Sequence, residues 1–263
     1  MIVFSNWKIY MHSKRMVTEY INELKNIRSL FRKDLIEVNI FPDFISLSLF
    51  YNEIKNLSIS LGVQDIYWED CGSYAGEVSP VMVKEIGCSC VYIGHSERKI
   101  KFHETSKSIN KKIKAAFKNN LIPFLFIGET KKEFKKNLTE SILKKQLEAY
   151  LDGIPIDYIS NLVLVYEPVW AIGQEESASV SIIQNSLKII LDLLKNLFGN
   201  GNINETRVLY GGSVNLINAK EIASIKEVDG FGSTRGSLNP NDFIQMIKIV
   251  EEEAYIRNQI NII

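Results

Sequence analysis

The sequence predicts an α/β protein in which strands and helices alternate along the whole chain. Short apolar runs of strand length recur from end to end, amphipathic segments separate them, and no linker, tandem module or low-complexity tract interrupts the series. At 263 residues the chain exceeds the usual size of one domain. Because α/β barrels of about 250 residues fold as one unit, we expect a single domain over residues 1–263.

Strands are predicted wherever about four to eight residues form an apolar run between turn residues. The clearest case is Leu162–Tyr166, because a continuously apolar run is typical of a strand buried on both faces, as in parallel sheets. The expected strands, in chain order, are Ile2–Lys8, Ile36–Ile40, Leu57–Gln64, Cys90–Ile93, Ile122–Ile127, Leu162–Tyr166, Arg207–Tyr210 and Val228–Phe231.

Helices are predicted where apolar residues recur at helical spacing, which places them on one face. The segment after the third strand differs, because a long loop with several glycines covers Asp65–Glu77 and only one or two helical turns follow at Val81–Ile86. The other expected helices are Ser13–Leu30, Phe44–Lys55, Thr105–Asn119, Lys131–Leu151, Ser179–Phe198, Asn218–Ser224 and Asn239–Arg257.

Two architectures fit this series of strand–helix repeats, a closed barrel and an open doubly wound sheet, since both are built with right-handed crossovers. No Gly-x-Gly-x-x-Gly motif opens the first helix, which weakens the dinucleotide-binding form of the doubly wound sheet. In a closed barrel the carboxyl ends of all strands converge on one mouth, so the residues at those ends form the candidate site.

Composition and charge exclude several functional classes. The 31 basic and 31 acidic side chains cancel, so nothing favours binding to nucleic acid or to an anionic membrane. No apolar run approaches the roughly 18 residues of a membrane span, and Met1–Lys8 lacks the basic segment of a signal peptide. Cys71, Cys88 and Cys90 are an odd number without metal-ligand spacing, which indicates buried free thiols, no metal site and a cytoplasmic protein.

Glu167 directly follows the buried strand Leu162–Tyr166, and Pro168 then prevents further strand pairing. A glutamate at a strand end is usually a solvated charge. Here, however, the following loop carries Trp170 and Ile172 and ends in glycine, a composition suited to a segment that folds over a site. We interpret Glu167 as a catalytic base beneath an apolar lid.

Asn6 and Lys8 end the first strand and lie two residues apart, on the same strand face. A lysine rarely faces inward unless it meets an anion, and a sugar phosphate would be one. Asn6 can hold Lys8 in place. An exposed lysine at the strand edge is the alternative for this residue alone.

His95 follows the fourth strand, with Gly94 allowing the turn and Ser96 able to cap the helical turn behind it. The positive end of a helix disfavours a further positive charge, so we expect a neutral imidazole that donates a hydrogen bond to a carbonyl oxygen. A lone histidine is more often structural, but the expected position opposite Glu167 favours a catalytic role.

Gly211 and Gly212 follow the seventh strand and leave backbone N–H groups free to face an anion, and Ser213 adds another donor. Barrels of this kind bind phosphate after strands seven and eight, so the position strengthens an otherwise weak motif.

Four motifs of the chain resemble those of triosephosphate isomerases, and Gln64, Gly76–Glu77 and Glu104 also match. The motifs are Asn6-Trp7-Lys8, Gly94-His95-Ser96-Glu97-Arg98, Tyr166-Glu167-Pro168-Val169-Trp170-Ala171-Ile172-Gly173 and Tyr210-Gly211-Gly212-Ser213. The resemblance spans nearly the whole chain in the right order and implies a single (β/α)8 TIM barrel. The implied reaction interconverts dihydroxyacetone phosphate and D-glyceraldehyde 3-phosphate, in glycolysis and gluconeogenesis, without metal or cofactor. It also implies a cytoplasmic homodimer that acts on a small phosphorylated sugar.

The resemblance assigns roles to the polar residues at the strand ends. Glu167 would carry a proton between C1 and C2 of the substrate through an enediolate, and His95 would polarise the carbonyl. Lys8 would stabilise negative charge with help from Asn6. Glu97 resembles a residue that orients Lys8 and assists proton transfer.

The remaining implied roles concern the phosphate and the lid. Backbone N–H groups of Gly173 and Ser213 would hold the phosphate. A lid over residues 168–178 would exclude water and keep the enediolate from losing phosphate. Arg98 would serve structure by pairing with Glu77.

The chain departs from the family pattern at several positions. The lid tip, usually Thr-Gly-Lys, is Gln174–Glu176 here, and we expect its two acids to lie in solvent. Phe126 replaces a small cysteine after the fifth strand, which requires local repacking. Ala75 replaces a threonine that reaches into the neighbouring subunit of the family's dimer.

The largest departure follows the eighth strand, where Gly232–Ser237 replaces the family's Leu-Val-Gly-Gly-Ala-Ser. Glycines that offer bare N–H groups to phosphate become Thr234 and Arg235, which costs about 1–2 kcal/mol wherever the backbone must be left-handed. In one hypothesis the loop keeps its N–H donors and Arg235 points away. In the other, Arg235 adds a forked charge to the phosphate, and Gly232, which replaces the apolar residue beneath the catalytic glutamate, leaves room for a longer substrate.

The second hypothesis would suit a related isomerase of a four-carbon ketose phosphate, a tetrulose phosphate. A barrel that binds a phosphorylated ligand without catalysis is a further alternative. It is disfavoured because Asn6, Lys8, His95 and Glu167 are all retained.

Overall fold

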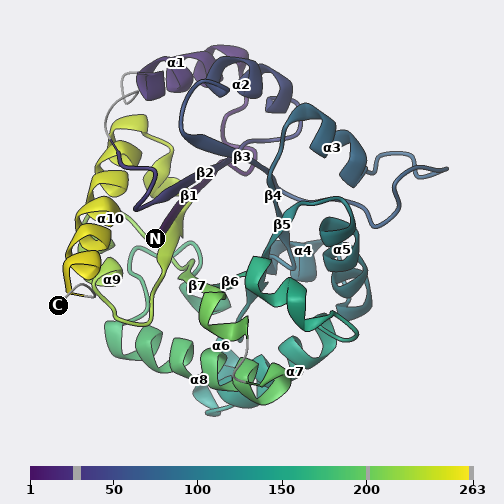
Figure 1. Cartoon of the computed structure of the whole chain (residues 1–263), viewed down its shortest axis with the longest axis vertical. Helices are drawn as coiled ribbons and strands as arrows, with labels where there is room; N and C mark the ends of the chain where they lie inside the picture. Colours follow the sequence, from purple (N-terminus) through teal and green to yellow (C-terminus); the bar gives the residue numbers. More distant parts are fainter. Residues whose placement is uncertain (26–30, 200–201, 261–263) are drawn as a thin grey trace.

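The computed structural model, which describes residues 1–25, 31–199 and 202–260, is a closed barrel of parallel strands surrounded by helices (Figure 1). Each strand pairs with the next along the chain, and β1 closes the barrel by pairing with β8. The barrel alternative is therefore correct and the doubly wound sheet is wrong. The strands are β1 (Ile2–Asn6), β2 (Glu37–Phe41), β3 (Ile59–Val63), β4 (Cys90–Ile93), β5 (Ile122–Ile127), β6 (Val163–Tyr166), β7 (Arg207–Tyr210) and β8 (Gly230–Ser233).

The helices lie outside the barrel and cover it on all sides (Figure 1). They are α1 (Lys14–Lys25), α2 (Leu47–Ile54), α3 (Pro80–Ile86), α4 (Ser96–Lys101), α5 (Ser106–Lys118), α6 (Lys131–Lys135), α7 (Thr139–Tyr150), α8 (Val180–Phe198), α9 (Ala219–Ala223) and α10 (Pro240–Ile260). Short 3-10 helices lie at η1 (Ile156–Asn161), η2 (Val169–Ala171), η3 (Asn202–Glu205) and η4 (Arg235–Ser237). Among the described residues, none of the helices combines the length and apolarity needed to span a bilayer.

Several predicted boundaries are corrected. The helix expected over Lys131–Leu151 is divided into α6 and α7, because Asn137 adopts a left-handed backbone (φ 55°) that ends α6. The first strand ends at Asn6, before Lys8, and the eighth strand is shifted from Val228–Phe231 to Gly230–Ser233. Of the helix expected over Ser13–Leu30, residues 26–30 lie outside the described part of the chain.

The core has two layers, one between barrel and helices and one inside the barrel. Strand residues alternate between these layers, since successive side chains point to opposite faces. The inner layer is rich in aromatic rings, and its buried members are Ile2, Phe4, Phe41, Cys90, Tyr92, Phe124, Phe126, Val163, Val165 and Leu209. Because these side chains fill the barrel, a ligand site can form only at one of its ends.

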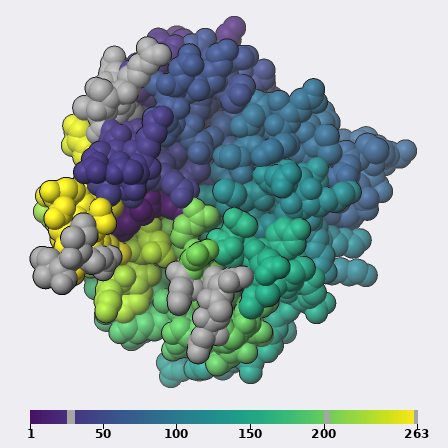
Figure 2. All heavy atoms as spheres, in the orientation of Figure 1, coloured from purple at the N-terminus to yellow at the C-terminus, as the bar shows by residue number. Residues whose placement is uncertain are grey.

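The segment between β3 and α3 projects from the body of the molecule, to the right in Figures 1 and 2. Its aromatic side chains pack on one another, with ring centroids of Tyr67 and Trp68 4.0 Å apart and those of Tyr67 and Tyr74 4.5 Å apart. Ser79 then caps α3 by accepting a hydrogen bond from the backbone N–H of Val81. The projection therefore has internal structure of its own.

Candidate active site

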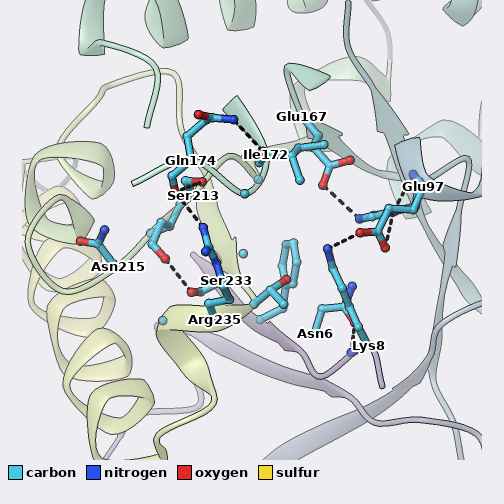
Figure 3. Close-up of a pocket in the computed structure, with 18 of the residues that line it drawn as sticks. Asn6, Lys8, Glu97, Glu167, Ile172, Gln174, Ser213, Asn215, Ser233 and Arg235 are labelled. Carbon is cyan, nitrogen blue, oxygen red and sulfur yellow. Dashed lines mark hydrogen bonds and ion pairs between the residues drawn. The ribbon is translucent and has the colours of Figure 1, made fainter. Parts of the chain in front are cut away.

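All of the predicted site residues line one cavity of about 540 Å³ at the carboxyl ends of the strands. Two groups face one another across it (Figure 3). Glu167, Glu97, Lys8 and Asn6 lie on one side, and the segments after β7 and β8 lie on the other. The predicted residues that share this cavity are Asn6, Lys8, His95, Glu97, Glu167, Gly173, Ser213, Thr234 and Arg235.

Lys8 lies just beyond β1 in a left-handed backbone conformation (φ 47°), which is uncommon for a lysine. Its backbone is held on both sides. The N–H donates to Asn6 Oδ1 at 2.9 Å, and the carbonyl accepts from Gln64 Nε2 at 2.9 Å. The Nζ atom lies 2.9 Å from Glu97 Oε1. A strained backbone of this kind persists where its surroundings fix it, and here it directs the ammonium group into the cavity.

His95 lies after Gly94, whose left-handed backbone (φ 73°) makes the turn out of β4. His95 itself is the N-cap of α4, because its Nδ1 accepts the backbone N–H of Glu97 at 3.2 Å. The expectation that Ser96 caps this helix is therefore wrong. Since Nδ1 acts as an acceptor, the hydrogen-bond network assigns the proton to Nε2 of a neutral imidazole. Nε2 lies 3.1 Å from Glu167 Oε1.

Glu167 follows β6, and its side chain is only 6% exposed. Its Oε1 faces His95, and its Oε2 accepts a 2.9 Å hydrogen bond from Ser96 Oγ. Burial alone would raise the pKa of the Glu167 carboxyl, but its interactions with His95, Lys8 and Ser96 outweigh burial and hold the pKa below the usual value. The carboxylate is thus ionised at neutral pH although it is buried.

The backbone of Glu167 is fixed by its neighbour in β5. Its N–H donates to the carbonyl of Ile127 at 2.8 Å. Gly128 lies so close that a Cβ built on it would be 2.1 Å from the Glu167 carbonyl oxygen. Only glycine fits there, so the position of the Glu167 main chain depends on Gly128.

The segment over residues 168–178, which we expect to act as a lid, is held by buried polar partners at both of its ends. Near its start, Trp170 Nε1 donates to Glu129 Oε1 at 2.9 Å, and the Glu129 side chain is fully buried. Near its end, the N–H of Ala178 donates to Tyr210 Oη at 3.0 Å. The acids at the lid tip are exposed, as expected, and Glu175 lines the mouth of the cavity.

The segments after β7 and β8 hold the lid tip from the other side. Ser213, with a left-handed backbone (φ 50°), donates its hydroxyl to the carbonyl of Ala171 at 2.7 Å. Arg235 Nη2 donates to the carbonyl of Gln174 at 2.9 Å, so the hypothesis that Arg235 points away is wrong (Figure 3). Neither Thr234 nor Arg235 has a positive φ, and the loop therefore carries no left-handed penalty.

Gly232 does not leave room for a longer substrate, contrary to that part of the second hypothesis. A Cβ built on Gly232 would lie 1.8 Å from Cζ of Phe4, because the Phe4 ring fills this space. Phe126, which is larger than the cysteine expected at this position, packs its ring against His95 with ring centroids 5.1 Å apart.

Arg98 does not pair with Glu77 within the chain. Its Nε lies 2.8 Å from Asp65 Oδ2 and 3.2 Å from Glu104 Oε1, and Lys112 bonds to both of these acids. This network joins Arg98 of α4 to Lys112 of α5 through the two acids.

Two residues of the site escaped the analysis of the sequence. Ser96 is an acceptable helix cap, so nothing in its neighbourhood pointed to a contact with Glu167. Phe4 could have been noticed, since it lies two residues before Asn6 in β1 and therefore shares the strand face that points into the barrel.

Comparisons with known proteins point to one family. Residues 1–250 match the family model described as triosephosphate isomerase. The chain is 36% identical over 247 residues to a protein named triosephosphate isomerase from Dictyoglomus turgidum, which covers 94% of this chain and 98% of that protein. Proteins of the same name from Alkaliphilus oremlandii and Clostridium botulinum are 37% and 33% identical over 246 residues, with the same coverage.

Proposed function

The chain belongs to the triosephosphate isomerase family, and from this premise we propose how its residues interconvert dihydroxyacetone phosphate and D-glyceraldehyde 3-phosphate. One observation carries the proposal. Glu167 and His95 are both buried, with Oε1 and Nε2 3.1 Å apart, at the wall of a cavity that also receives Lys8. A carboxylate, a neutral N–H donor and an ammonium group are the groups that proton transfer next to a carbonyl requires.

The proton transfer begins when the substrate carbonyl replaces Glu167 as the acceptor for the Nε2–H of His95. The released carboxylate removes a proton from the carbon next to the carbonyl, and the electron pair of that C–H bond moves onto the oxygen to give an enediolate. Lys8, held by Asn6 and Glu97, stabilises the negative charge. The hydroxyl proton on the deprotonated carbon reaches the former carbonyl oxygen through His95, whose Nε2 gives its own proton to that oxygen and takes the hydroxyl proton in its place. Glu167 then returns its proton to the former carbonyl carbon and the new carbonyl forms on the neighbouring carbon, so both residues return to their starting states. Glu97 assists by orienting Lys8, 2.9 Å away.

A positioned base contributes about 10²–10⁴-fold to the rate, so the remainder depends on the environment of the site. Fixed donors around the developing charge act without reorganising, and exclusion of water strengthens each of them. The lid over residues 168–178 excludes the water and keeps the enediolate from losing phosphate to solvent.

The phosphate binds on the side of the cavity opposite Glu167. The backbone N–H groups of Gly173 and Ser213 face the dianion, and Thr234 and Arg235 complete the site. Support comes from the left-handed backbone of Gly173 (φ 70°) and Ser213 (φ 50°), which directs these N–H groups differently from regular structure. Arg235 adds the only described guanidinium that lines the cavity.

The functional unit is a cytoplasmic homodimer of chains that each form one domain over residues 1–263. Support for the dimer comes from the projecting β3–α3 segment and from large exposed apolar side chains that include Tyr74, Met82 and Phe102. Support for the cytoplasm comes from the three cysteines, which are free thiols. Cys88 and Cys90 are buried as expected, whereas Cys71 is exposed, so the expectation that it is buried is wrong. Sedimentation equilibrium across a range of protein concentrations tests the dimer.

Initial rates with D-glyceraldehyde 3-phosphate, in an assay that couples dihydroxyacetone phosphate to a dehydrogenase, test the proposed function. Turnover that is lost in a Glu167→Gln variant supports the assigned base. Tetrulose phosphates are measured beside the triose. Binding of phosphorylated ligands without turnover would instead favour the non-catalytic barrel.

A further inference from the structure

Phe4 of β1 fills the space that belongs to the side chain of residue 232. The two residues are paired in the register of β1 and β8. A Cβ built on Gly232 would lie 1.8 Å from Cζ and 1.9 Å from Cε2 of Phe4, so the ring lies directly over the glycine. The family has an apolar side chain at this position, beneath the catalytic glutamate. In this chain the adjacent strand supplies the apolar volume.

The Phe4 ring is fixed within a cluster of aromatic rings and is only 3% exposed. It meets four other rings edge-on, with centroid distances between 5.6 and 6.4 Å. These rings are Phe41, Tyr92, Phe124 and Phe126. Such contacts favour one orientation, so the position of Phe4 is set by its neighbours.

This aromatic cluster reaches the His95–Glu167 pair from below. Phe126 packs against His95 at 5.1 Å between ring centroids. Phe126 and Glu167 also border the same space beside Gly211. A Cβ built on Gly211 would lie 3.9 Å from Phe126 Cε1 and 3.8 Å from Glu167 Cβ. Phe4 contacts Phe126 and lines the same cavity as His95 and Glu167.

We propose that Phe4 is a positioning residue for the isomerisation, whose ring, together with Phe126, forms the floor beneath Glu167 and His95 and keeps water from the carboxylate. This inference rests on the proposed roles of Glu167 and His95. It assigns to β1 a task that the family resemblance places on β8.

The inference makes the behaviour of the base depend on Phe4. Burial raises the pKa of Glu167, so water admitted in place of the ring should lower that pKa and move the acid limb of kcat/KM to lower pH. The titratable groups that face Glu167 from the surrounding elements are Lys8, Tyr92, His95, Lys99 and Tyr210. Of these groups, Tyr92 contacts the Phe4 ring, with ring centroids 5.6 Å apart.

The experiment measures three variants, Phe4→Ala, Gly232→Leu and the double variant that combines these two substitutions. Phe124→Ala is measured beside them as the control. Phe124 is the matched control, because its ring contacts Phe4 at 5.6 Å but does not line the cavity. For Phe4→Ala we expect kcat to fall about 10–100-fold, since misplacement of a catalytic group by about 1 Å costs up to about 100-fold. KM should change little, because the phosphate is held on the other side. Phe124→Ala should lose thermal stability but keep its kcat and its acid limb.

Gly232→Leu alone should lose activity, because the new side chain meets the Phe4 ring. The kcat of the double variant should be at least about tenfold higher than that of Phe4→Ala, since a leucine at 232 can then occupy the space that the Phe4 ring leaves. The inference is overturned if Phe4→Ala matches Phe124→Ala in kcat and pH profile, or if the double variant recovers nothing.

If Phe4→Ala does not fold, Phe4→Leu is used in its place, because leucine leaves a smaller cavity. We expect the same directions of change in kcat and in the acid limb. The inference is equally overturned if the acid limb of Phe4→Leu is unshifted and if adding Gly232→Ala to Phe4→Leu does not raise kcat. The wild-type protein is assayed first. Triose turnover that is insensitive to Phe4 refutes only this inference, whereas absence of wild-type turnover refutes the proposed function.

Discussion

Shortening Glu167 to aspartate withdraws the carboxylate by one methylene without removing it. In the structure its oxygens lie 3.1 Å from His95 Nε2 and 2.9 Å from Ser96 Oγ. Loss of one C–C bond of about 1.5 Å lengthens both contacts to roughly 4.5 Å, beyond the limit of about 3.2 Å for a hydrogen bond. The main chain cannot follow, because Gly128 already lies against the Glu167 carbonyl.

The size of the effect follows from that displacement. A base misplaced by about 1 Å loses about 10²-fold, and a positioned base contributes about 10²–10⁴-fold in all. We therefore expect kcat of Glu167→Asp to fall about 10²–10³-fold, which is about 2.7–4 kcal/mol of transition-state stabilisation. KM should stay close to the wild-type value, because the phosphate contacts assigned to Gly173, Ser213 and Arg235 are untouched.

Initial rates in both directions, with kcat and KM determined separately, measure this effect. Glu104→Asp is the control, because Glu104 is another buried carboxylate that is shortened by the same methylene but bonds to Lys112 and Arg98 outside the cavity. It should lower thermal stability and leave kcat nearly unchanged. An unchanged kcat in Glu167→Asp, or an equal fall in Glu104→Asp, would refute the assignment of Glu167 as the base.

Three further predictions concern the pH dependence, the phosphate site and the lid. Ser96→Ala removes a hydrogen bond donated to the ionised carboxyl of Glu167, so its pKa rises and the acid limb of kcat/KM moves to higher pH; an unmoved limb contradicts this role. Arg235→Gln should raise KM about tenfold and weaken competitive inhibition by inorganic phosphate, and equal values for variant and wild type would show that Arg235 does not meet the phosphate. Tyr210→Phe leaves the buried N–H of Ala178 without its acceptor, at a cost of about 1–3 kcal/mol to the lid, so more phosphate should be released per turnover. A wild-type ratio of phosphate release to isomerisation would contradict that prediction.

The sequence was sufficient to predict those parts of the site that follow from strand ends. Parallel strands in a closed barrel bring their carboxyl ends together, so Lys8, His95, Glu167 and Ser213 could be assigned to one mouth before any coordinates were known. The apolar runs also indicated the strands of the barrel, most clearly β6, because a strand buried on both faces is continuously apolar. The eighth strand lies two residues later than its apolar run predicted, since β8 is Gly230–Ser233 and contains two glycines. Local signals carried this information.

What could not be predicted depends on contacts between distant segments. Arg98 meets Asp65, which follows β3, and Glu104, which precedes α5, and the sequence does not show that these segments lie together. The break between α6 and α7 depends on the left-handed backbone of Asn137, which an asparagine adopts only in some contexts.

The pairing of Phe4 with Gly232 is of the same kind. Each residue is unremarkable in its own strand, and the alternation along β1 already places Phe4 inside the barrel. The meaning of the glycine becomes visible only once β1 and β8 are known to be neighbours in a defined register. A glycine at the mouth of a barrel can therefore signal a larger side chain on the adjacent strand, as well as an empty space.

Trp170 lies in the lid, and its fluorescence should depend on the position of the lid. The indole of Trp170 donates to the buried carboxylate of Glu129 and lies 4.7 Å from the ring of Phe134, so any movement of the lid alters the polarity around it. The other two tryptophans are poor sources of such a change, since Trp7 is wholly enclosed and Trp68 stacks on Tyr67 in the projecting segment. Intrinsic emission should thus report the proposed movement of the lid with no label attached.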